Sequence, residues 1–268
     1  MSGAYPPDTA LDAVSTASTL LVATDFDGVL APFDADPMKA MPLPGTVDTL
    51  RALAGLPGVH VAVVSGRDLD TLRTLTGLTE DEPIVLIASH GAESSDEQVR
   101  EAMEAAAVTP DDEVTLAELR SDIESLVKER HPDAGIEYKS AAVVVHTRGL
   151  PKDVGDAAIA DARRVALDHE GVKVLKGKSV LELSVSHADK GSAVTALGRA
   201  VGATARVYLG DDVTDEDAFM RMTRPEDVTV KVGTGSTAAR YRLDDEPAVA
   251  RFLDALLERR RAAGTDAD

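Results

Sequence analysis

Three short, almost wholly apolar segments set the strongest limit on how this chain can fold. They are Leu20–Thr24, Val59–Val64 and Ile84–Ala88. Runs of this kind are typical of strands that are buried on both faces of a parallel sheet. Between the second and third runs, Leu69, Leu72 and Leu75 recur at the spacing of one helical face. The pattern predicts strand–helix–strand units, and hence a doubly wound α/β fold with a Rossmann-like parallel sheet.

The composition indicates which binding partners and which cellular compartment suit this chain. The chain has 268 residues, of which 44% are hydrophobic, so it can bury a sizeable core. Its 47 acidic residues against 28 basic ones give a net charge of -19, which would repel nucleic acids and anionic membranes. The apolar runs are too short to span a bilayer, and the first twenty residues lack the basic start of a signal peptide. We therefore expect no nucleic-acid or membrane partner and a cytoplasmic location.

The absence of cysteine excludes several kinds of catalytic and metal-binding site. Without cysteine the chain has no disulfide, no thiolate nucleophile and no cysteine-ligated zinc. Any metal must be held by oxygen or imidazole ligands, and oxygen-rich sites suit Mg²⁺ best.

An inserted module interrupts the core pattern. After an acidic connector at residues 110–113, the spacing predicts, in order, a helix, two strands at 135–139 and 141–148, a helix around 154–169, and two strands near 172–175 and 179–185. These strands alternate: Leu181 and Leu183 share one face, and Glu182 and Ser184 share the other, so one side of the sheet is polar. The core pattern returns with a helix that begins at Lys190. We expect a core of residues 1–112 and 186–268 with a smaller α+β domain at 113–185.

Two carboxylates follow the first apolar run directly, as Asp25 and Asp27. Side chains alternate along an extended chain, so both carboxylates point the same way, and Gly28 allows a sharp bend after them. Two like charges held together call for a cation. These residues alone fit an Asp–Gly turn equally well, so groups elsewhere must decide.

Other polar groups are expected at the same edge of the sheet. The second run ends in Ser65, Gly66 and Arg67, where a hydroxyl and backbone N–H groups could hold phosphate oxygens. Lys190 opens a helix, although most lysines are simply exposed. A further strand ends in Gly210 and five acids within residues 211–217, which would also suit a solvated helix start. Ligands of open parallel sheets bind at the carboxyl ends of the strands. We therefore interpret these polar groups as parts of one functional site and not as unrelated turns and helix starts.

These motifs resemble those of the phosphotransferases of the haloacid dehalogenase-like superfamily. The matching residues are Asp25-x-Asp27, Ser65, Lys190 and Gly210-Asp211-x-x-x-Asp215. The resemblance implies that Asp25 is the nucleophile, and that Asp27 protonates the leaving oxygen and then activates water. It implies Mg²⁺ held by Asp25, the Asp27 carbonyl and Asp211, with Asp215 direct or through water. Ser65 and Lys190 would bind the phosphate oxygens. The inserted domain would be a cap that selects the substrate.

Three further sequence motifs are similar to those of the trehalose 6-phosphate phosphatase family. They are Ser89-His90-Gly91-Ala92-Glu93, Glu137-x-Lys139 with His146-x-Arg148, and Gly177-Lys178-Ser179-Val180-Leu181-Glu182. In that family the residues matching Glu137, Lys139, Arg148, Lys178 and Glu182 contact the sugar. Without the core motifs, cross-strand ion pairs on an exposed sheet would explain these polar residues as well.

The resemblance predicts magnesium-dependent hydrolysis of trehalose 6-phosphate through an aspartyl-phosphate. A monomer is expected, with a functional link to a trehalose 6-phosphate synthase. Two alternatives stay open: an enzyme for another sugar phosphate, such as a sucrose 6-phosphate phosphatase or a hexose-phosphate mutase, and a non-catalytic sugar-phosphate sensor.

Overall fold

The chain forms two compact units. The computed structural model describes residues 8–139, 141–177, 179–185 and 188–265. The first unit consists of the residues up to Glu104 and from Ala188 onward, and the second consists of the residues between. No helix in these described ranges combines the length and the apolar character needed to cross a bilayer.

The first unit carries a seven-stranded sheet. Its elements are α1 (Asp8–Ser15), β1 (Leu20–Thr24), η1 (Pro37–Lys39), α2 (Thr46–Ala54), β2 (Val59–Val64), α3 (Leu69–Thr76), β3 (Ile84–Ala88), η2 (Ser89–Gly91), β4 (Glu93–Ser94), α4 (Glu97–Ala107), α7 (Lys190–Ala200), β9 (Ala205–Gly210), η3 (Val213–Asp215), α8 (Glu216–Arg221), β10 (Val228–Val232), β11 (Tyr241–Leu243) and α9 (Glu246–Thr265). The strand order is β11-β10-β9-β1-β2-β3-β4, and every pairing is parallel except that of β3 with β4. The predicted doubly wound α/β core is confirmed.

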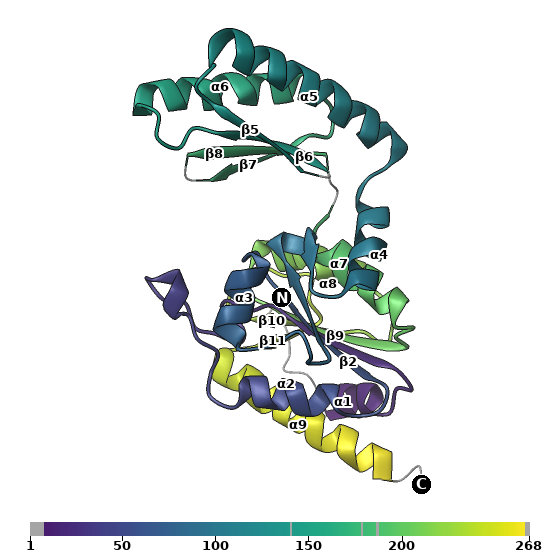
Figure 1. Cartoon of the computed structure of the whole chain (residues 1–268). Helices are drawn as coiled ribbons and strands as arrows, with labels where there is room; N and C mark the ends of the chain where they lie inside the picture. Colours follow the sequence, from purple (N-terminus) through teal and green to yellow (C-terminus); the bar gives the residue numbers. More distant parts are fainter. Residues whose placement is uncertain (1–7, 140, 178, 186–187, 266–268) are drawn as a thin grey trace. The chain divides into compact units, whose positions relative to one another are not determined.

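Alternation within the central strands explains the two helical layers. On β1, Leu20 and Val22 pack with α1, α2 and α9, whereas Leu21 and Ala23 pack with α4, α7 and α8 (Figure 1). Both faces are buried, which is why the strand sequences are apolar throughout. The edge left free is the carboxyl end of the sheet, where polar side chains can gather.

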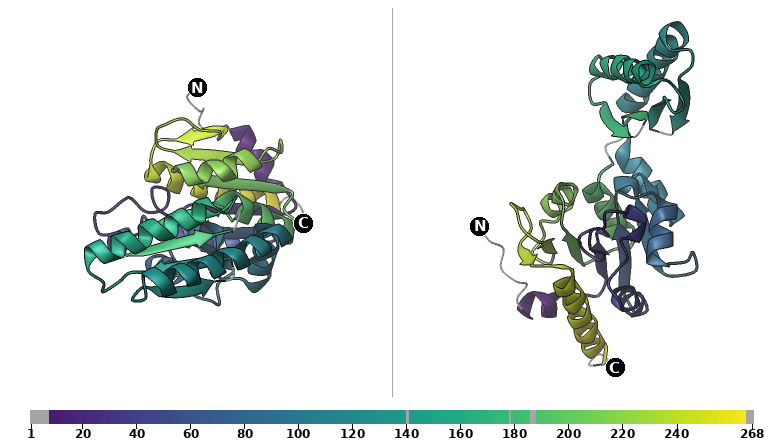
Figure 2. Two further views of the ribbon diagram at one scale, coloured as in Figure 1. Left: turned by 90° about the horizontal axis from the view of Figure 1, so that it is seen from above. Right: turned by 90° about the vertical axis from the view of Figure 1, so that its left-hand side faces the viewer.

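The second unit is a four-stranded antiparallel sheet covered on one face by two helices (Figures 1 and 2). Its elements are α5 (Pro110–Arg130), β5 (Gly135–Lys139), β6 (Ala142–His146), α6 (Lys152–Leu167), β7 (Lys173–Gly177) and β8 (Val180–Ser184), with strand order β5-β6-β8-β7. Leu181 and Leu183 face the helices, where they pack with Leu119 and Ile123 of α5. The opposite face of the sheet is the polar one, as expected from the alternation.

The structure corrects several predicted boundaries. The segment 110–113 is the first turn of α5 and not a connector, because Thr109 caps the helix and Pro110 stands at its first position, where proline is tolerated. Strand β6 ends at His146, so Arg148 lies in the following turn with Gly149 and does not share a strand face with His146. The expected domain boundary at 112/113 falls inside α5 and stays a prediction.

Candidate functional site

Residues from four distant segments meet at the carboxyl end of the parallel sheet. Asp25 follows β1, Ser65 follows β2, Asp211 follows β9, and Lys190 begins α7. They line a cavity of about 420 Å³ together with Asp27, Phe33, Asp34, Pro37, Gly66, Arg67, His90, Asp212 and Thr214. The predicted core site residues other than Asp215 are all among its lining, and Asp215 lies directly behind it, bonded to Lys190.

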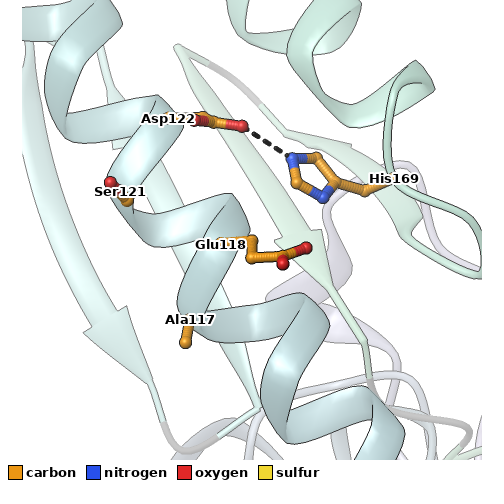
Figure 3. Close-up of a pocket in the computed structure, with 5 residues that line it drawn as sticks. All are labelled: Ala117, Glu118, Ser121, Asp122 and His169. Carbon is orange, nitrogen blue, oxygen red and sulfur yellow. Dashed lines mark hydrogen bonds and ion pairs between the residues drawn. The ribbon is translucent and has the colours of Figure 1, made fainter.

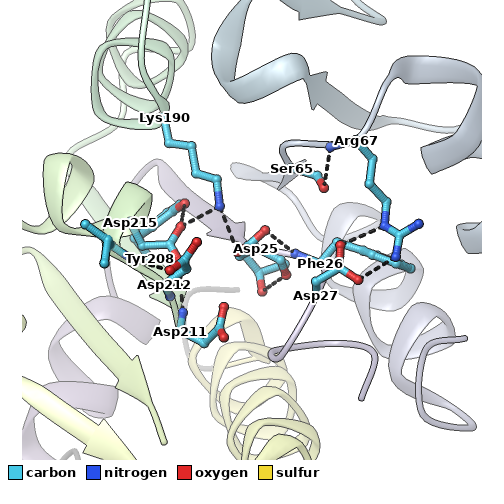
Figure 4. A network of polar contacts seen from close by, with 12 residues as sticks. Asp25, Phe26, Asp27, Ser65, Arg67, Lys190, Tyr208, Asp211, Asp212 and Asp215 are labelled. Carbon is cyan, nitrogen blue, oxygen red and sulfur yellow. Dashed lines mark hydrogen bonds and ion pairs between the residues drawn. The ribbon is translucent and has the colours of Figure 1, made fainter. Parts of the chain in front are cut away.

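A buried lysine lies between two aspartates. The Nζ atom of Lys190 donates to Oδ2 of Asp25 at 2.7 Å and to Oδ1 of Asp215 at 2.9 Å (Figure 4). Burial and the nearby charge of Asp215 raise the pKa of Asp25 well above its usual range, although Lys190 opposes this shift. Burial alone would lower the pKa of Lys190, but the two carboxylates outweigh it and raise the value. Lys190 therefore stays charged beside Asp25.

Asp215 is enclosed by hydrogen-bond donors. Its Oδ1 accepts from Lys190 and from the hydroxyl of Tyr208 at 2.7 Å, and its Oδ2 accepts from the backbone N–H groups of Asp211 and Asp212 at 2.9 Å each. The side chain is completely buried. A carboxylate has about four acceptor positions, so all of them are used here.

Asp25, Asp211 and Asp215 form an acidic cluster of the kind that holds a divalent cation. One carboxylate oxygen from each lies within 4.8 Å of the others. Burial and the charge of Asp215 raise the pKa of Asp211 to about 6. Both causes disfavour the charged carboxylate, and a bound cation would oppose both. Hard oxygen donors at this spacing fit Mg²⁺.

Gly28 allows the chain to pass close to this cluster. It has φ +68°, and a Cβ atom there would lie 2.3 Å from Oδ2 of Asp211. Only glycine combines that backbone conformation with so close an approach. The bend after Asp27 that is predicted from this glycine therefore lets the chain pass directly beside Asp211.

Arg67 holds the second aspartate of the motif. Its Nε and Nη2 each lie 2.7 Å from an oxygen of Asp27, and its Nη1 donates to the carbonyl of Pro37 at 2.7 Å. The guanidinium also lies 5.5 Å from the ring centre of Phe26. The hydrogen bonds of Asp27 raise the pKa of Arg67. The residue that was expected to bind substrate is paired with a carboxylate in this structure.

The turn that carries Ser65 is held by hydrogen bonds from Ser89 and His90, whose backbone conformation is strained. The N–H groups of Ser89 and His90 donate to the carbonyls of Arg67 and Ser65, at 2.8 and 2.9 Å. Ser89 and His90 have φ values of 50° and 57°, which are uncommon for residues other than glycine. The imidazole of His90 leaves no room for a side chain at Gly66, where a Cβ would lie 2.4 Å from it. The Oγ of Ser65 accepts from the Arg67 N–H at 3.2 Å, so its own proton can go to a ligand.

In the second unit, the predicted sugar-binding residues form cross-strand pairs on the polar face. Lys139 donates to Glu182 at 2.7 Å, and His146 lies 2.7 Å from Glu137. Arg148 is exposed in the turn after β6, and Lys178 lies outside the described residues. The structure therefore brings Glu137, Lys139 and Glu182 to one face of one sheet.

Comparison with known proteins assigns the family. The model of the family described as trehalose-phosphatase matches residues 23–247. This chain belongs to that family. It is 34% identical over 276 residues to a trehalose-phosphate phosphatase of Mycobacterium tuberculosis, an alignment that covers 96% of this chain and 67% of that protein. An uncharacterized glycosyl hydrolase of the same species is 35% identical over 249 residues, covering 88% of this chain and 18% of that protein.

Solved structures agree on the fold. The trehalose-6-phosphate phosphatase of Aspergillus fumigatus superposes with a TM-score of 0.64 at 24% identity, covering 96% of this chain and 99% of that one. The C-terminal domain of the Candida albicans enzyme superposes with a TM-score of 0.62 at 23% identity, covering 96% and 98%. At these identities the likeness shows that this member of the trehalose-phosphatase family shares their architecture.

A second cavity lies outside all predicted site residues. It has about 500 Å³ and is lined by Ala117, Glu118, Ser121, Asp122 and His169 (Figure 3). His169 lies 3.0 Å from Asp122, which ties the end of α6 to α5. None of the motif residues of the trehalose-phosphatase family lines it.

Sequence reasoning missed three residues that contact the site of this trehalose-phosphatase family member. Tyr208 donates to Asp215, and the buried Lys231 donates to the backbone carbonyl of Asp211. The Oγ1 atom of Thr214 is buried in the cavity wall and has no hydrogen-bond partner among the described residues. Lys231 offered a signal, because a lysine inside the apolar run 228–232 needs a buried acceptor. Tyr208 did not, since an aromatic residue in a strand is ordinarily part of the core.

Proposed function

We propose that this protein hydrolyses trehalose 6-phosphate to trehalose and inorganic phosphate. The observation that carries the proposal is the meeting of Asp25, Asp27, Ser65, Lys190 and Asp211 in one cavity of a chain that belongs to the trehalose-phosphatase family. A nucleophile, a proton donor and charges for the phosphoryl oxygens are what phosphoryl transfer requires.

Asp25 is the proposed nucleophile. One of its carboxylate oxygens attacks phosphorus, the bond from phosphorus to the sugar oxygen breaks, and an aspartyl-phosphate forms. Oδ1 of Asp25 accepts from the Phe26 N–H at 2.7 Å, which orients the carboxylate. Water then attacks the phosphorus, and Asp25 is released together with inorganic phosphate.

Asp27 handles the proton in both half-reactions. It protonates the leaving sugar oxygen and later takes a proton from the attacking water. Both oxygens of Asp27 accept hydrogen bonds from Arg67. For the first step Asp27 takes up a proton and gives up one of these bonds. The other bond keeps Asp27 in place, and the freed N–H of Arg67 is available to an oxygen of the substrate.

Ser65, Lys190 and the backbone N–H group of Gly66 hold the phosphoryl oxygens. Support comes from the Ser65 hydroxyl, which has its proton free to donate, and from the charged Lys190. The unpartnered hydroxyl of Thr214 is a further donor in the same cavity wall.

Mg²⁺ is the proposed cofactor. The carboxylates of Asp25 and Asp211 and the carbonyl of Asp27 would hold it. Asp215, whose oxygens already accept four hydrogen bonds, would act through a metal-bound water that takes the place of one of these donors. When bound, the ion neutralises negative charge on the transferred phosphoryl group.

The second unit is proposed to be the cap that selects the sugar. Glu137, Lys139 and Glu182 offer charged donors and acceptors on one face, which suits the hydroxyls of a disaccharide. Arg148 and Lys178 are proposed to join them. The expected monomeric state and the link to a synthase stay predictions.

Phosphate release from a panel of sugar phosphates tests the proposal. We expect trehalose 6-phosphate to be preferred over sucrose 6-phosphate and glucose 6-phosphate, with Mg²⁺ required. We also expect Asp25→Asn to abolish turnover, whereas Asp70→Asn, at an exposed aspartate of α3, should leave it unchanged. A tenfold preference for another sugar phosphate, about 1.4 kcal/mol in transition-state binding, would reject the substrate. Turnover by Asp25→Asn would reject the nucleophile.

A further inference from the structure

Tyr208 places a phenol behind the catalytic cavity. It stands on β9, three positions before Asp211, and its side chain is completely buried. The ring meets that of Phe219 on α8 edge to face, with 5.8 Å between the ring centres. This contact fixes the direction of the hydroxyl, which donates to Oδ1 of Asp215 at 2.7 Å (Figure 4).

The acceptor of this hydrogen bond is shared with Lys190. Oδ1 of Asp215 receives both the phenol and the ammonium, while Oδ2 receives two backbone N–H groups of the loop that carries Asp211. The contacts therefore run in an unbroken chain from Tyr208 through Asp215 and Lys190 to Asp25. Each link is between 2.7 and 2.9 Å.

The shared oxygen gives the hydroxyl two effects. The Tyr208 hydroxyl helps to fix the Asp215 carboxylate where no solvent reaches it. It also occupies part of the acceptor capacity of Oδ1, which Lys190 would otherwise use alone. Without the phenol, the ammonium would be the sole side-chain donor to Oδ1 and would be drawn toward Asp215. Lys190 would then lie farther from Asp25 and from the phosphoryl oxygens.

We propose that Tyr208 is a positioning residue that keeps Lys190 directed at Asp25 and at the transferred phosphoryl group. The proposal rests on the function proposed above. It assigns no contact between Tyr208 and the substrate, because the phenol lies behind Asp215. Its effect should therefore appear in the chemical step, with little effect on ground-state binding.

Tyr208→Phe tests the proposal, because it removes the hydroxyl and keeps the ring against Phe219. We expect kcat to fall about tenfold, with KM and the affinity for Mg²⁺ alone, measured by calorimetry, within twofold of the parent. The thermal midpoint of each variant shows that it is folded. Tyr241→Phe, at a tyrosine on β11 of the same sheet, should match the parent. Phe219→Leu disturbs the ring contact and keeps the hydroxyl, so it should reduce kcat less than Tyr208→Phe does.

A double-mutant cycle separates positioning from simple packing. In an Asp215→Ala background, which removes the shared acceptor, followed by single-turnover kinetics at high enzyme concentration, the added Tyr208→Phe should change the rate less than twofold. Three results would overturn the proposal: an unchanged kcat in Tyr208→Phe, an equal loss in both backgrounds, or a loss that arises only through KM or Mg²⁺ affinity.

The same variants are compared on p-nitrophenyl phosphate, a small aryl phosphate without the sugar that the second unit is proposed to select. A parent that hydrolyses the aryl phosphate but not trehalose 6-phosphate contradicts the proposed substrate. The comparison on the aryl phosphate still decides the role of Tyr208.

Discussion

The Nζ atom of Lys190 lies 2.7 Å from Oδ2 of Asp25, and both side chains are almost completely buried. Asp215 adds a second carboxylate to the same ammonium, so one cation faces two anions in a place with little solvent. Burial, together with this local excess of negative charge, raises the pKa of Asp25 and Asp211. The proposed Mg²⁺ would offset the charge, so the stability of the protein without it should depend on pH.

The metal-free protein should lose stability from Asp211 as the pH rises. Its pKa of about 6 lies above the unfolded value, so the folded state binds the proton more tightly. That contribution is full below about pH 4 and disappears as the pH passes 6. Between pH 5 and 7.5 we expect a loss of about 1 kcal/mol, after a discount for solvent screening. Urea unfolding in EDTA measures it, and Asp211→Asn should remove it. An equal pH effect in parent and variant would contradict the assignment.

Gly28→Ala should damage the metal site. The added Cβ would lie 2.3 Å from Oδ2 of Asp211, so that carboxylate must move. We expect Mg²⁺ affinity, measured by calorimetry, to fall at least tenfold. Gly77→Ala is the matched control, since its φ of +64° imposes the same backbone strain with no atom within 4 Å. Both variants should lose about 1–2 kcal/mol of stability. Equal Mg²⁺ affinities in the two variants would show that the close approach is unimportant.

Arg67→Lys should slow turnover although the charge is kept. Lysine cannot hold both oxygens of Asp27 and the Pro37 carbonyl in one planar fork. We expect kcat to fall by about tenfold or more, because Asp27 is then poorly placed for proton transfer. Arg73→Lys, at a surface arginine of α3 paired with Glu80, should leave kcat unchanged. Unchanged kinetics in Arg67→Lys would show that the bidentate contact of the Arg67 guanidinium with Asp27 is not needed for turnover.

Glu182→Ala should separate sugar recognition from chemistry. The Lys139–Glu182 pair is partly exposed, so its loss should cost less than about 1 kcal/mol of stability. We expect kcat/KM for trehalose 6-phosphate to fall at least tenfold and that for p-nitrophenyl phosphate to stay within twofold. Asp156→Ala, which breaks an exposed ion pair with Lys152 on α6, is the control. An equal loss on both substrates would contradict a role in sugar binding.

Much of the fold was predictable because local pattern reports burial directly. The runs 20–24, 59–64 and 84–88 match β1, β2 and β3 residue for residue. Both faces of these strands are covered, so their sequences carry an uninterrupted apolar signal. Elements with weaker signals were missed, among them α1, the helix α4 and the two-residue strand β4. Arg148 was placed on a strand because the alternation in the sequence continues past His146, where the chain in fact turns.

The sequence by itself determined which strands are buried and where they end. It also determined that Asp25, Ser65 and Asp211 stand at those ends and that Lys190 begins a helix. Only the tertiary structure decided how these groups pair: that Arg67 holds Asp27, and that Tyr208 and Lys190 share one oxygen of Asp215. The physical reason is that burial and strand ends follow from neighbouring residues. A hydrogen bond between residues 165 positions apart, as between Asp25 and Lys190, depends on the register of strands and helices that no local pattern contains.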